Sequence, residues 1–169
     1  MPDIPPIVLP LIARSKQAIN RPGLPDAFWE IDHGPTILAL FMELAFELTE
    51  LSDEDFASLP LGYQLVAHLF SWEAECEADG WGAFGNIDEV AFEALCACFC
   101  AIGLPAEAES LQVQMAAYLR DPSDAEALDA SIRTSRHKQS GRLSPIQFAT
   151  QYLCDHAQQL LYLPDCSAT

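Results

Sequence analysis

The chain has 169 residues, half of them apolar, and its eight Lys and Arg against 25 Asp and Glu give a formal net charge of −17. A chain of this length is long enough to bury one sizeable core, so we expect residues 1–169 to form a single domain. Phosphate binding requires basic patches, so this charge argues against direct binding of nucleic acid.

Positive charge is missing from a long central stretch. The 98 residues from Pro22 to Leu119 contain 18 Asp and Glu but no Lys or Arg, whereas the rest of the chain is nearly neutral. Ordinary composition would place on the order of ten basic residues in such a stretch. The distribution therefore indicates selection against positive charge in the middle of the chain.

Membrane and secretory signals are not expected. The longest apolar run near the start, Ile7 to Ala13, is short and contains Pro10, and Asp3 precedes any Lys or Arg. Six cysteines occur without a CxxC pair, so reduced and mostly buried thiols fit better than disulfides. These features predict a cytoplasmic protein that has no membrane partner.

The first 35 residues are expected to form an arm and a loop ahead of a helical core at 36–163. Residues 7–18 suit a short helix with a basic side, and the Pro- and Gly-rich stretch 20–35 reads as a loop. Phe28 and Trp29 are expected to anchor that loop to the core.

A strong helix is predicted from Thr36 to Leu51. Its apolar residues occupy about three sides, and Glu43, Glu47 and Glu50 share the remaining narrow strip. No Lys or Arg is near them in sequence, so these three carboxylates are expected to repel one another across a solvent-facing row.

Ser52 is expected to cap a short turn that carries Asp53, Glu54 and Asp55 at its positive N-terminal end. A central helix then runs from Pro60 to a left-handed cap at Gly80. Its apolar stripe consists of Leu61, Leu65, Leu69, Trp72 and Cys76. Its second half carries Glu73, Glu75, Glu77 and Asp79, so this helix is expected to begin inside the protein and end at an acidic surface.

The second half of the chain is predicted to be helical as well. Asp88 caps a helix that ends at Gly103, and Pro105 opens another that extends to about Leu119. Further helices are expected at 124–132 and, behind a Ser144 cap, at 145–161, with a basic loop at 133–141 between them. No segment alternates as a strand does, so we predict an all-α fold of about six or seven helices packed largely antiparallel.

The cysteines and His68 are better interpreted as core residues than as metal ligands or catalytic groups. In a helix, Cys98 points away from the side shared by Cys96 and Cys100, so one metal ion cannot bind all three. His68 is more typical of a half-buried core histidine than of a general base. We expect no catalytic residue, no cofactor and no metal site, because basic donors are absent from the 98-residue stretch and no EF-hand, HExxH or phosphate-binding loop occurs.

Three functions remain open from the residues alone. The first is a non-enzymatic acidic module that binds the basic surface of a partner such as a DNA-binding protein. Its candidate binding residues are Glu43, Glu47, Glu50, Asp53, Glu54, Glu73, Glu75, Glu77 and Asp79. The second is a helical domain whose acidity serves solubility. The third, a carboxylate-based metal hydrolase, would require a bound divalent ion.

One part of the chain resembles a known family. The resemblance is carried by Leu59-Pro60, the run Trp72 to Cys76, Asp79-Gly80-Trp81 with Phe84, and the helix Ala91 to Gly103. These residues resemble a bacterial domain family of unknown function that includes an acidic DNA-mimic protein. The resemblance covers roughly residues 59–119. It implies a helical fold and, for at least one member, occupation of a transcription factor's DNA-binding face.

Two further expectations follow from the crowded carboxylates. If the charge serves binding, the glutamates at 43, 47 and 50 should share one face of the molecule with Glu73, Glu75 or Glu77. Without counter-ions these groups should have raised pKa values, so that stability increases as the pH falls towards about 5. Neutralising Glu43 and Glu47 should then stabilise the fold.

Overall fold

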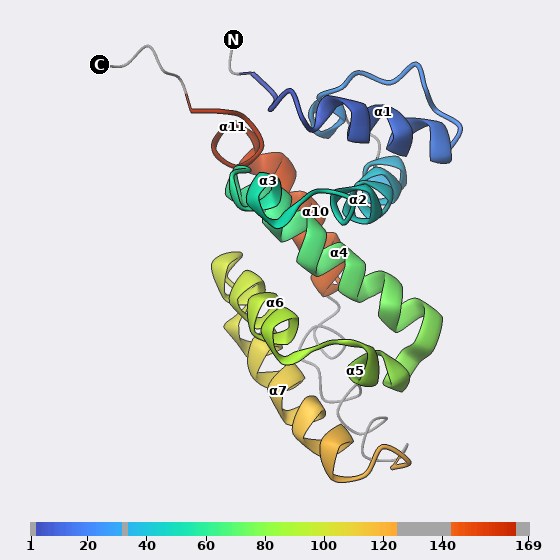
Figure 1. The fold of residues 1–169 in the computed structure, drawn as a ribbon, viewed down its shortest axis with the longest axis vertical. Coiled ribbons are helices and arrows are strands. Elements are labelled where there is room, and N and C mark those ends of the chain that lie inside the picture. The colour runs from blue at the N-terminus through green and yellow to red at the C-terminus, as the bar shows by residue number, and fades with distance from the viewer. Residues whose placement is uncertain (1–2, 32–33, 125–142, 165–169) are drawn as a thin grey trace. The chain divides into compact units, whose positions relative to one another are not determined.

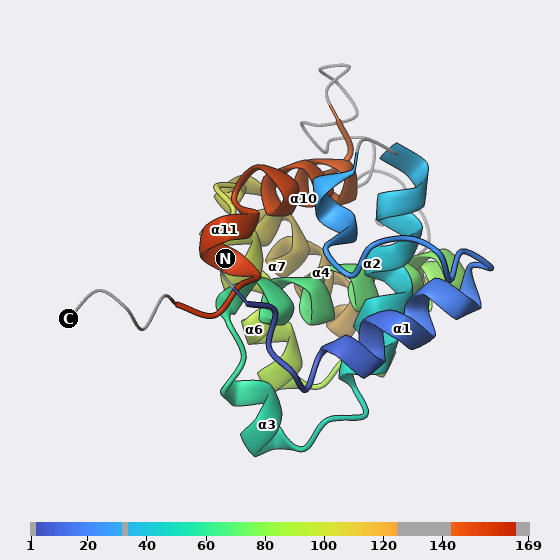
Figure 2. The same ribbon diagram turned by 90° about the horizontal axis from the view of Figure 1, so that it is seen from above.

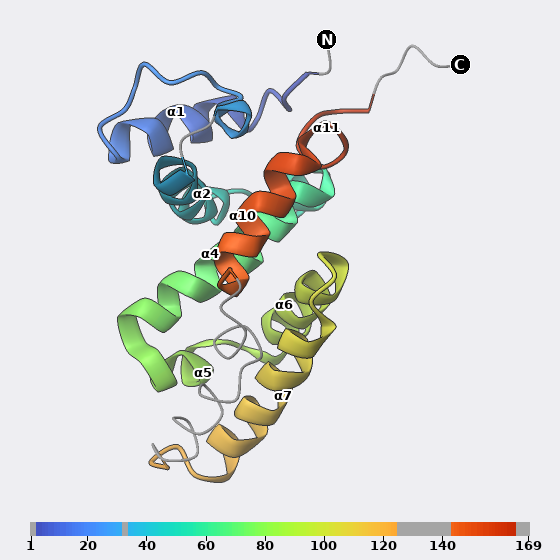
Figure 3. The ribbon, with the colours of Figure 1, turned by 180° about the vertical axis from the view of Figure 1, so that it is seen from behind.

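The computed structural model describes residues 3–31, 34–124 and 143–164. Within these ranges all regular structure is helical, and the predicted all-α fold is confirmed. The expected helix at 124–132 and the basic loop at 133–141 lie, apart from Asp124, outside the described residues. The chain divides into two compact units, shown in Figures 1 to 3: unit 1 comprises Met1–Ser71 and Thr150–Thr169, and unit 2 comprises Trp72–Ala149.

Unit 1 begins with α1 (Leu9–Ala18), which lies against α2 (Gly34–Leu48) (Figure 2). A short 3-10 turn, η1 (Phe28–Glu30), links them, and both of its aromatic residues, Phe28 and Trp29, are buried as expected. The segment predicted to be an arm also contributes buried Val8, Leu11 and Ile12 to the core. The described part of the first 35 residues therefore contributes to the packed structure of unit 1.

The short helix α3 (Asp53–Ala57) follows, and its predicted cap is confirmed. The Ser52 hydroxyl accepts a hydrogen bond from the backbone N–H of Asp55 at 3.2 Å and donates one to the Asp55 carboxylate at 2.8 Å. Asp53 and Glu54 are exposed in the first turn of this helix. An acidic first turn is stabilised by the positive end of the helix dipole.

The central helix α4 (Leu61–Asp79) has the predicted length but a different buried face at its start. Leu65, Leu69 and Trp72 are buried, whereas Leu61, which we expected in the same stripe, is 48% exposed. Tyr63 is fully buried in its place, and its hydroxyl donates a hydrogen bond to the Leu161 carbonyl at 2.8 Å. The first turn is thus oriented by a contact with the C-terminal segment.

The C-terminal segment packs against α4 through a glycine. The predicted helix at 145–161 is interrupted at His156, which separates α10 (Pro145–Asp155) from α11 (Ala157–Leu160). A Cβ atom at Gly62 would lie only 2.4 Å from the Leu160 carbonyl oxygen. Only glycine allows the backbones of α4 and α11 to approach so closely.

Unit 2 begins at Trp72 within α4, and after the end of this helix Gly80 has the left-handed φ of 55° that the sequence predicts for a cap. The turn η2 (Gly80–Gly82) and the one-turn helix α5 (Ala83–Asn86) follow. Trp81 and Phe84 of this turn meet Tyr118 with ring centroids 5.4 and 6.2 Å apart. The aromatic residues thus tie the turn to α7.

A helical hairpin completes unit 2. The helix α6 (Glu89–Ala101) is capped by Asp88, whose carboxylate accepts from the Ala91 N–H at 2.8 Å, and Gly103 turns the chain with a φ of 83°. The helix α7 (Pro105–Arg120) then returns beside α6 (Figure 3). No described helix is long and apolar enough to cross a membrane.

Candidate acidic interaction surface

The predicted acidic residues form two groups that belong to different units, apart from the short acidic turn of α3. We call Glu43 and Glu47 on α2, together with Glu50 just after its C-terminal end, the α2 row, and Glu73, Glu75, Glu77 and Asp79 on α4 the α4 cluster. The α2 row lies in unit 1 and the α4 cluster in unit 2. Each group is described by itself, and a single band that joins them stays a prediction.

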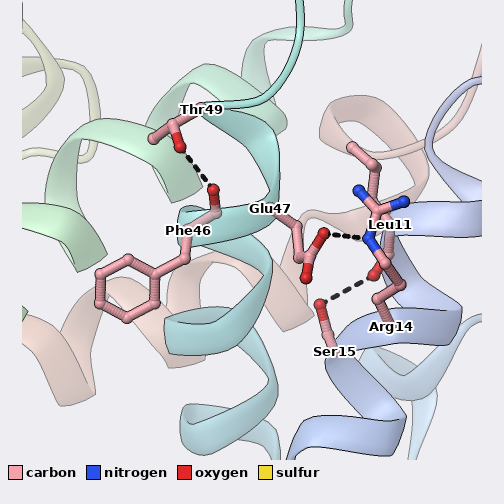
Figure 4. A network of polar contacts seen from close by, with 6 residues as sticks. All are labelled: Leu11, Arg14, Ser15, Phe46, Glu47 and Thr49. Carbon is pink, nitrogen blue, oxygen red and sulfur yellow. Dashed lines mark hydrogen bonds and ion pairs between the residues drawn. The ribbon is translucent and has the colours of Figure 1, made fainter.

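The α2 row does not lack a counter-ion, which corrects the expectation of an unpaired strip. The Arg14 guanidinium on α1 donates to the Glu47 carboxylate, as Figure 4 shows. Arg14 lies 33 residues away in sequence, so only the packing of α1 on α2 brings the two together. Glu43 and Glu47 are half-buried and Glu50 is exposed. Part of the charge of this row therefore serves the contact between two helices.

The basic side expected on the first helix is also used inside unit 1. Lys16 is buried, and its ammonium donates to the Leu24 carbonyl at 2.9 Å and to the Asp26 carboxylate at 2.6 Å. These bonds hold the loop after α1 against its own helix. Between residues that the structure describes, both ion pairs, Arg14–Glu47 and Lys16–Asp26, lie in unit 1.

The α4 cluster is arranged differently. Its members occupy two flanks of the helix, because residues four apart lie on the same side: Glu73 above Glu77, and Glu75 above Asp79. The side-chain amide of Asn86 donates to Asp79 at 2.8 Å and to Glu75 at 3.3 Å. An amide carries no charge, so this bridge fixes two carboxylates and leaves their negative charge in place.

Glu73 is the member whose environment most disfavours ionisation. It is half-buried, and burial, followed by repulsion from Glu77, raises the pKa of its carboxyl. The expected increase of pKa is thus confirmed for this residue, although burial contributes more than repulsion. Glu75, Glu77 and Asp79 are exposed. The cluster therefore presents three exposed carboxylates beside a fourth that is partly withdrawn from water.

The cysteine thiols of α4 and α6 are not activated as nucleophiles. Burial, together with Glu73 and Glu75, raises the pKa of the Cys76 thiol to about 12. Burial raises the pKa of Cys98 to about 11, and Cys96 is also buried and has a raised pKa. A nucleophilic cysteine needs a lowered pKa, so these groups stay protonated at neutral pH. Cys100 is the exposed member of the run.

Other candidate groups have ordinary surroundings. His68 is half-buried, packs edge-on against Phe56 at 6.0 Å, and has a pKa lowered by burial. Among the described residues no group of three or more His, Cys, Asp and Glu side chains is placed to hold a metal ion. His33, His137 and Cys166 lie outside the described residues.

One feature of unit 2 was missed by sequence reasoning. A groove of about 1070 Å³ lies between α6 and α7, lined by apolar side chains and by Glu89 and Glu93. Phe92, Met115 and Tyr118 are half-buried along this groove. The periodicity of α6 and α7 identified their apolar faces but not the space between them.

Comparisons of the chain with family models, with curated proteins and with solved structures found no match.

Proposed function

We propose that this protein is a non-enzymatic acidic interaction module whose α4 cluster binds a basic surface of a partner protein. The observation that carries the proposal is the 98-residue stretch with 18 carboxylates and no Lys or Arg. In unit 2, the carboxylates at 75 and 79 are held by the Asn86 amide, and no described Lys or Arg pairs with them. Charges fixed in position without local neutralisation are suited to meet a cationic partner.

The density of charge on α4 supports a more specific form of the proposal, a DNA mimic. At a rise of 1.5 Å per residue, the four acidic residues from Glu73 to Asp79 span roughly 9 Å of helix axis. Duplex DNA carries about five charges over the same length, since it has one per ~1.7 Å of axis. A protein surface that recognises phosphates by Lys and Arg would find a comparable density of negative charge here. The partner in this form is a DNA-binding protein, and the complex forms in the cytoplasm.

The test measures how captured proteins are released. Immobilised full-length protein is loaded with lysate at low salt, and bound proteins are eluted separately by rising salt and by short duplex DNA. A DNA mimic should release a DNA-binding protein in both elutions, because salt and duplex compete for the same basic surface. Release by salt but not by duplex would support a basic partner that does not bind DNA. Capture of no basic protein at low salt would leave solubility as the role of the charge.

A charge-matched pair of variants locates the surface. Glu75→Gln with Glu77→Gln removes two charges from the α4 cluster, whereas Glu109→Gln with Asp155→Asn removes two exposed charges elsewhere. If the α4 cluster binds the partner, only the first variant should lose it at moderate salt. Equal loss in both variants would show that net charge, and not this cluster, holds the partner.

A further inference from the structure

The groove between α6 and α7 is a mostly apolar surface in unit 2. Its apolar lining includes Phe84, Ile87, Phe92, Ala97, Met115 and Leu119. Leu119 is 72% exposed, and Phe92 and Met115 are only half-buried. Apolar side chains left in water along a groove favour an apolar occupant, because burying their surface is favourable.

The charges along the groove are all of one sign. Glu89 and Glu93 are both exposed, line the groove and lie one turn apart on α6, roughly 6 Å along its axis. The described lining contains no Lys or Arg. An occupant that fits this surface is apolar on one side and positively charged where it faces these two glutamates.

We infer that this groove docks an amphipathic basic helix of the partner protein. Its apolar side chains, one turn apart, enter between α6 and α7, and its Lys or Arg residues contact Glu89 and Glu93, in the way that helical segments occupy grooves elsewhere. This inference rests on the proposed function and names the part of the partner that is bound. A small-molecule site would instead place several polar groups at its centre, whereas these carboxylates are exposed to solvent.

The probe for this site is a synthetic helical peptide of 14 residues made of Leu and Lys, with Leu at positions i, i+3, i+4 and i+7. Two matched peptides separate the contributions: one replaces every Leu by Ser, and the other replaces every Lys by Glu. Each peptide is titrated into the full-length protein in a calorimeter. The dissociation constant of the Leu/Lys peptide should be at least about tenfold lower than that of either control peptide.

Two variants place the peptide on the groove. Ala97→Trp fills the groove from an exposed position on α6 and should weaken the Leu/Lys peptide about tenfold. Glu89→Gln with Glu93→Gln should weaken it about fivefold at low salt and less at high salt. The charge-matched control Glu109→Gln with Asp155→Asn removes two exposed charges that do not line the groove and should leave this affinity unchanged.

A footprint gives an independent readout. Cys100 is an exposed thiol in the lining of the groove, so bound Leu/Lys peptide should slow its alkylation by iodoacetamide, read at that site by tandem mass spectrometry. The Ser-containing peptide should not slow it.

The outcomes separate this inference from the proposed function. Equal binding of the Leu/Lys peptide to wild type and to Ala97→Trp, with loss in Glu75→Gln/Glu77→Gln, would overturn the groove and keep the α4 cluster as the binding surface. Binding of the Ser-containing peptide as tightly as the Leu/Lys peptide would do the same. Equal binding of the Glu-containing peptide would overturn the basic character of the occupant. Failure of both Lys-containing peptides to bind would overturn the groove, and the duplex-competition experiment would still decide the function.

Discussion

In unit 1, Glu47 and Asp26 pair with cations and Glu30 meets a hydroxyl, whereas in the α4 cluster of unit 2 the carboxylates meet an amide and one another. In unit 1, Glu47 pairs with Arg14, and Glu30 accepts a hydrogen bond from the hydroxyl of Tyr162, which in turn accepts one from Trp29 at 3.2 Å. In unit 2, Asn86 bridges Glu75 and Asp79. The same residue type thus supports packing in one unit and leaves charge available for a partner in the other.

Two sites, one in each unit, also differ in how closely they are packed. In unit 1 the backbones at Gly62 and Leu160 leave no room for a Cβ atom, and Tyr63 is fully buried between the same segments. In unit 2 the α6–α7 hairpin leaves a groove of about 1070 Å³. A tightly packed site tolerates added atoms poorly, whereas a groove accommodates them.

The largest expected effect tests this difference in packing. Gly62→Ala should destabilise the protein by about 2 to 3 kcal/mol, because the added methyl collides with a backbone carbonyl that cannot move aside. Ala97→Trp adds many more atoms but places them in the groove, so it should change stability by less than about 0.5 kcal/mol. Urea unfolding of both variants measures the difference. Gly23→Ala, where a Cβ meets nothing within 4 Å, is the control in unit 1.

The next effect tests hydrogen bonding inside unit 1. Tyr63→Phe removes the hydroxyl that donates to the Leu161 carbonyl and leaves a buried acceptor without its partner, which should cost about 1 to 2 kcal/mol. Burial and the nearby Tyr162 raise the pKa of Tyr63, so the phenol stays protonated at all ordinary pH values. The cost should therefore be the same at pH 6 and pH 8, and a cost that changes between them would contradict this assignment.

Removing a negative charge should change the stability of the protein in opposite directions in the two units. Glu47→Gln should destabilise unit 1 by up to about 1 kcal/mol, since it breaks the pair with Arg14, which is partly exposed. Our expectation from sequence, that neutralising Glu43 and Glu47 stabilises the fold, assumed that no cation was near and is replaced by this prediction. Thermal melts of Glu47→Gln, Arg14→Gln and the double variant give the coupling between the two residues. Additive effects would show that the pair contributes nothing.

The smallest effect concerns Glu73 and gives the pH dependence. Its folded pKa is raised above the ordinary Glu value of 4.5, so the folded state binds a proton more readily than the unfolded state. Its ionisation therefore costs stability at pH 7.5, and this cost disappears as the pH falls through the raised pKa towards 4.5. Glu73→Gln should stabilise the protein by roughly 0.2 to 0.5 kcal/mol at pH 7.5 and by nothing near pH 4.5. Melts at the two pH values, with Glu109→Gln as the exposed control, measure the change.

Local features of the fold were predictable because they depend on neighbouring residues. The caps at Ser52 and Asp88, and the positive φ of Gly80 and Gly103, follow from side chains and glycines within a few positions of each helix end. The all-α fold and the α4 cluster follow from periodicity in the same way.

Features that depend on distant segments were not predictable. Leu61 follows the apolar period of α4 but is exposed, since the first turn is held by Tyr63 and the C-terminal segment. The break at His156 likewise interrupts a continuous helical pattern. Periodicity gives the side of a helix that is apolar but not the partner that covers it, so it also gave no sign of the groove between α6 and α7.

The sequence by itself determined that the protein is helical, where most of its helices begin and end, and that its middle carries negative charge without a basic residue. Only the tertiary structure decided which of those charges are neutralised. Arg14 reaches Glu47 across 33 residues, whereas Asn86 holds Glu75 and Asp79 without neutralising them. The physical reason is that Coulomb interactions depend on distance in space, and the packing of helices sets those distances.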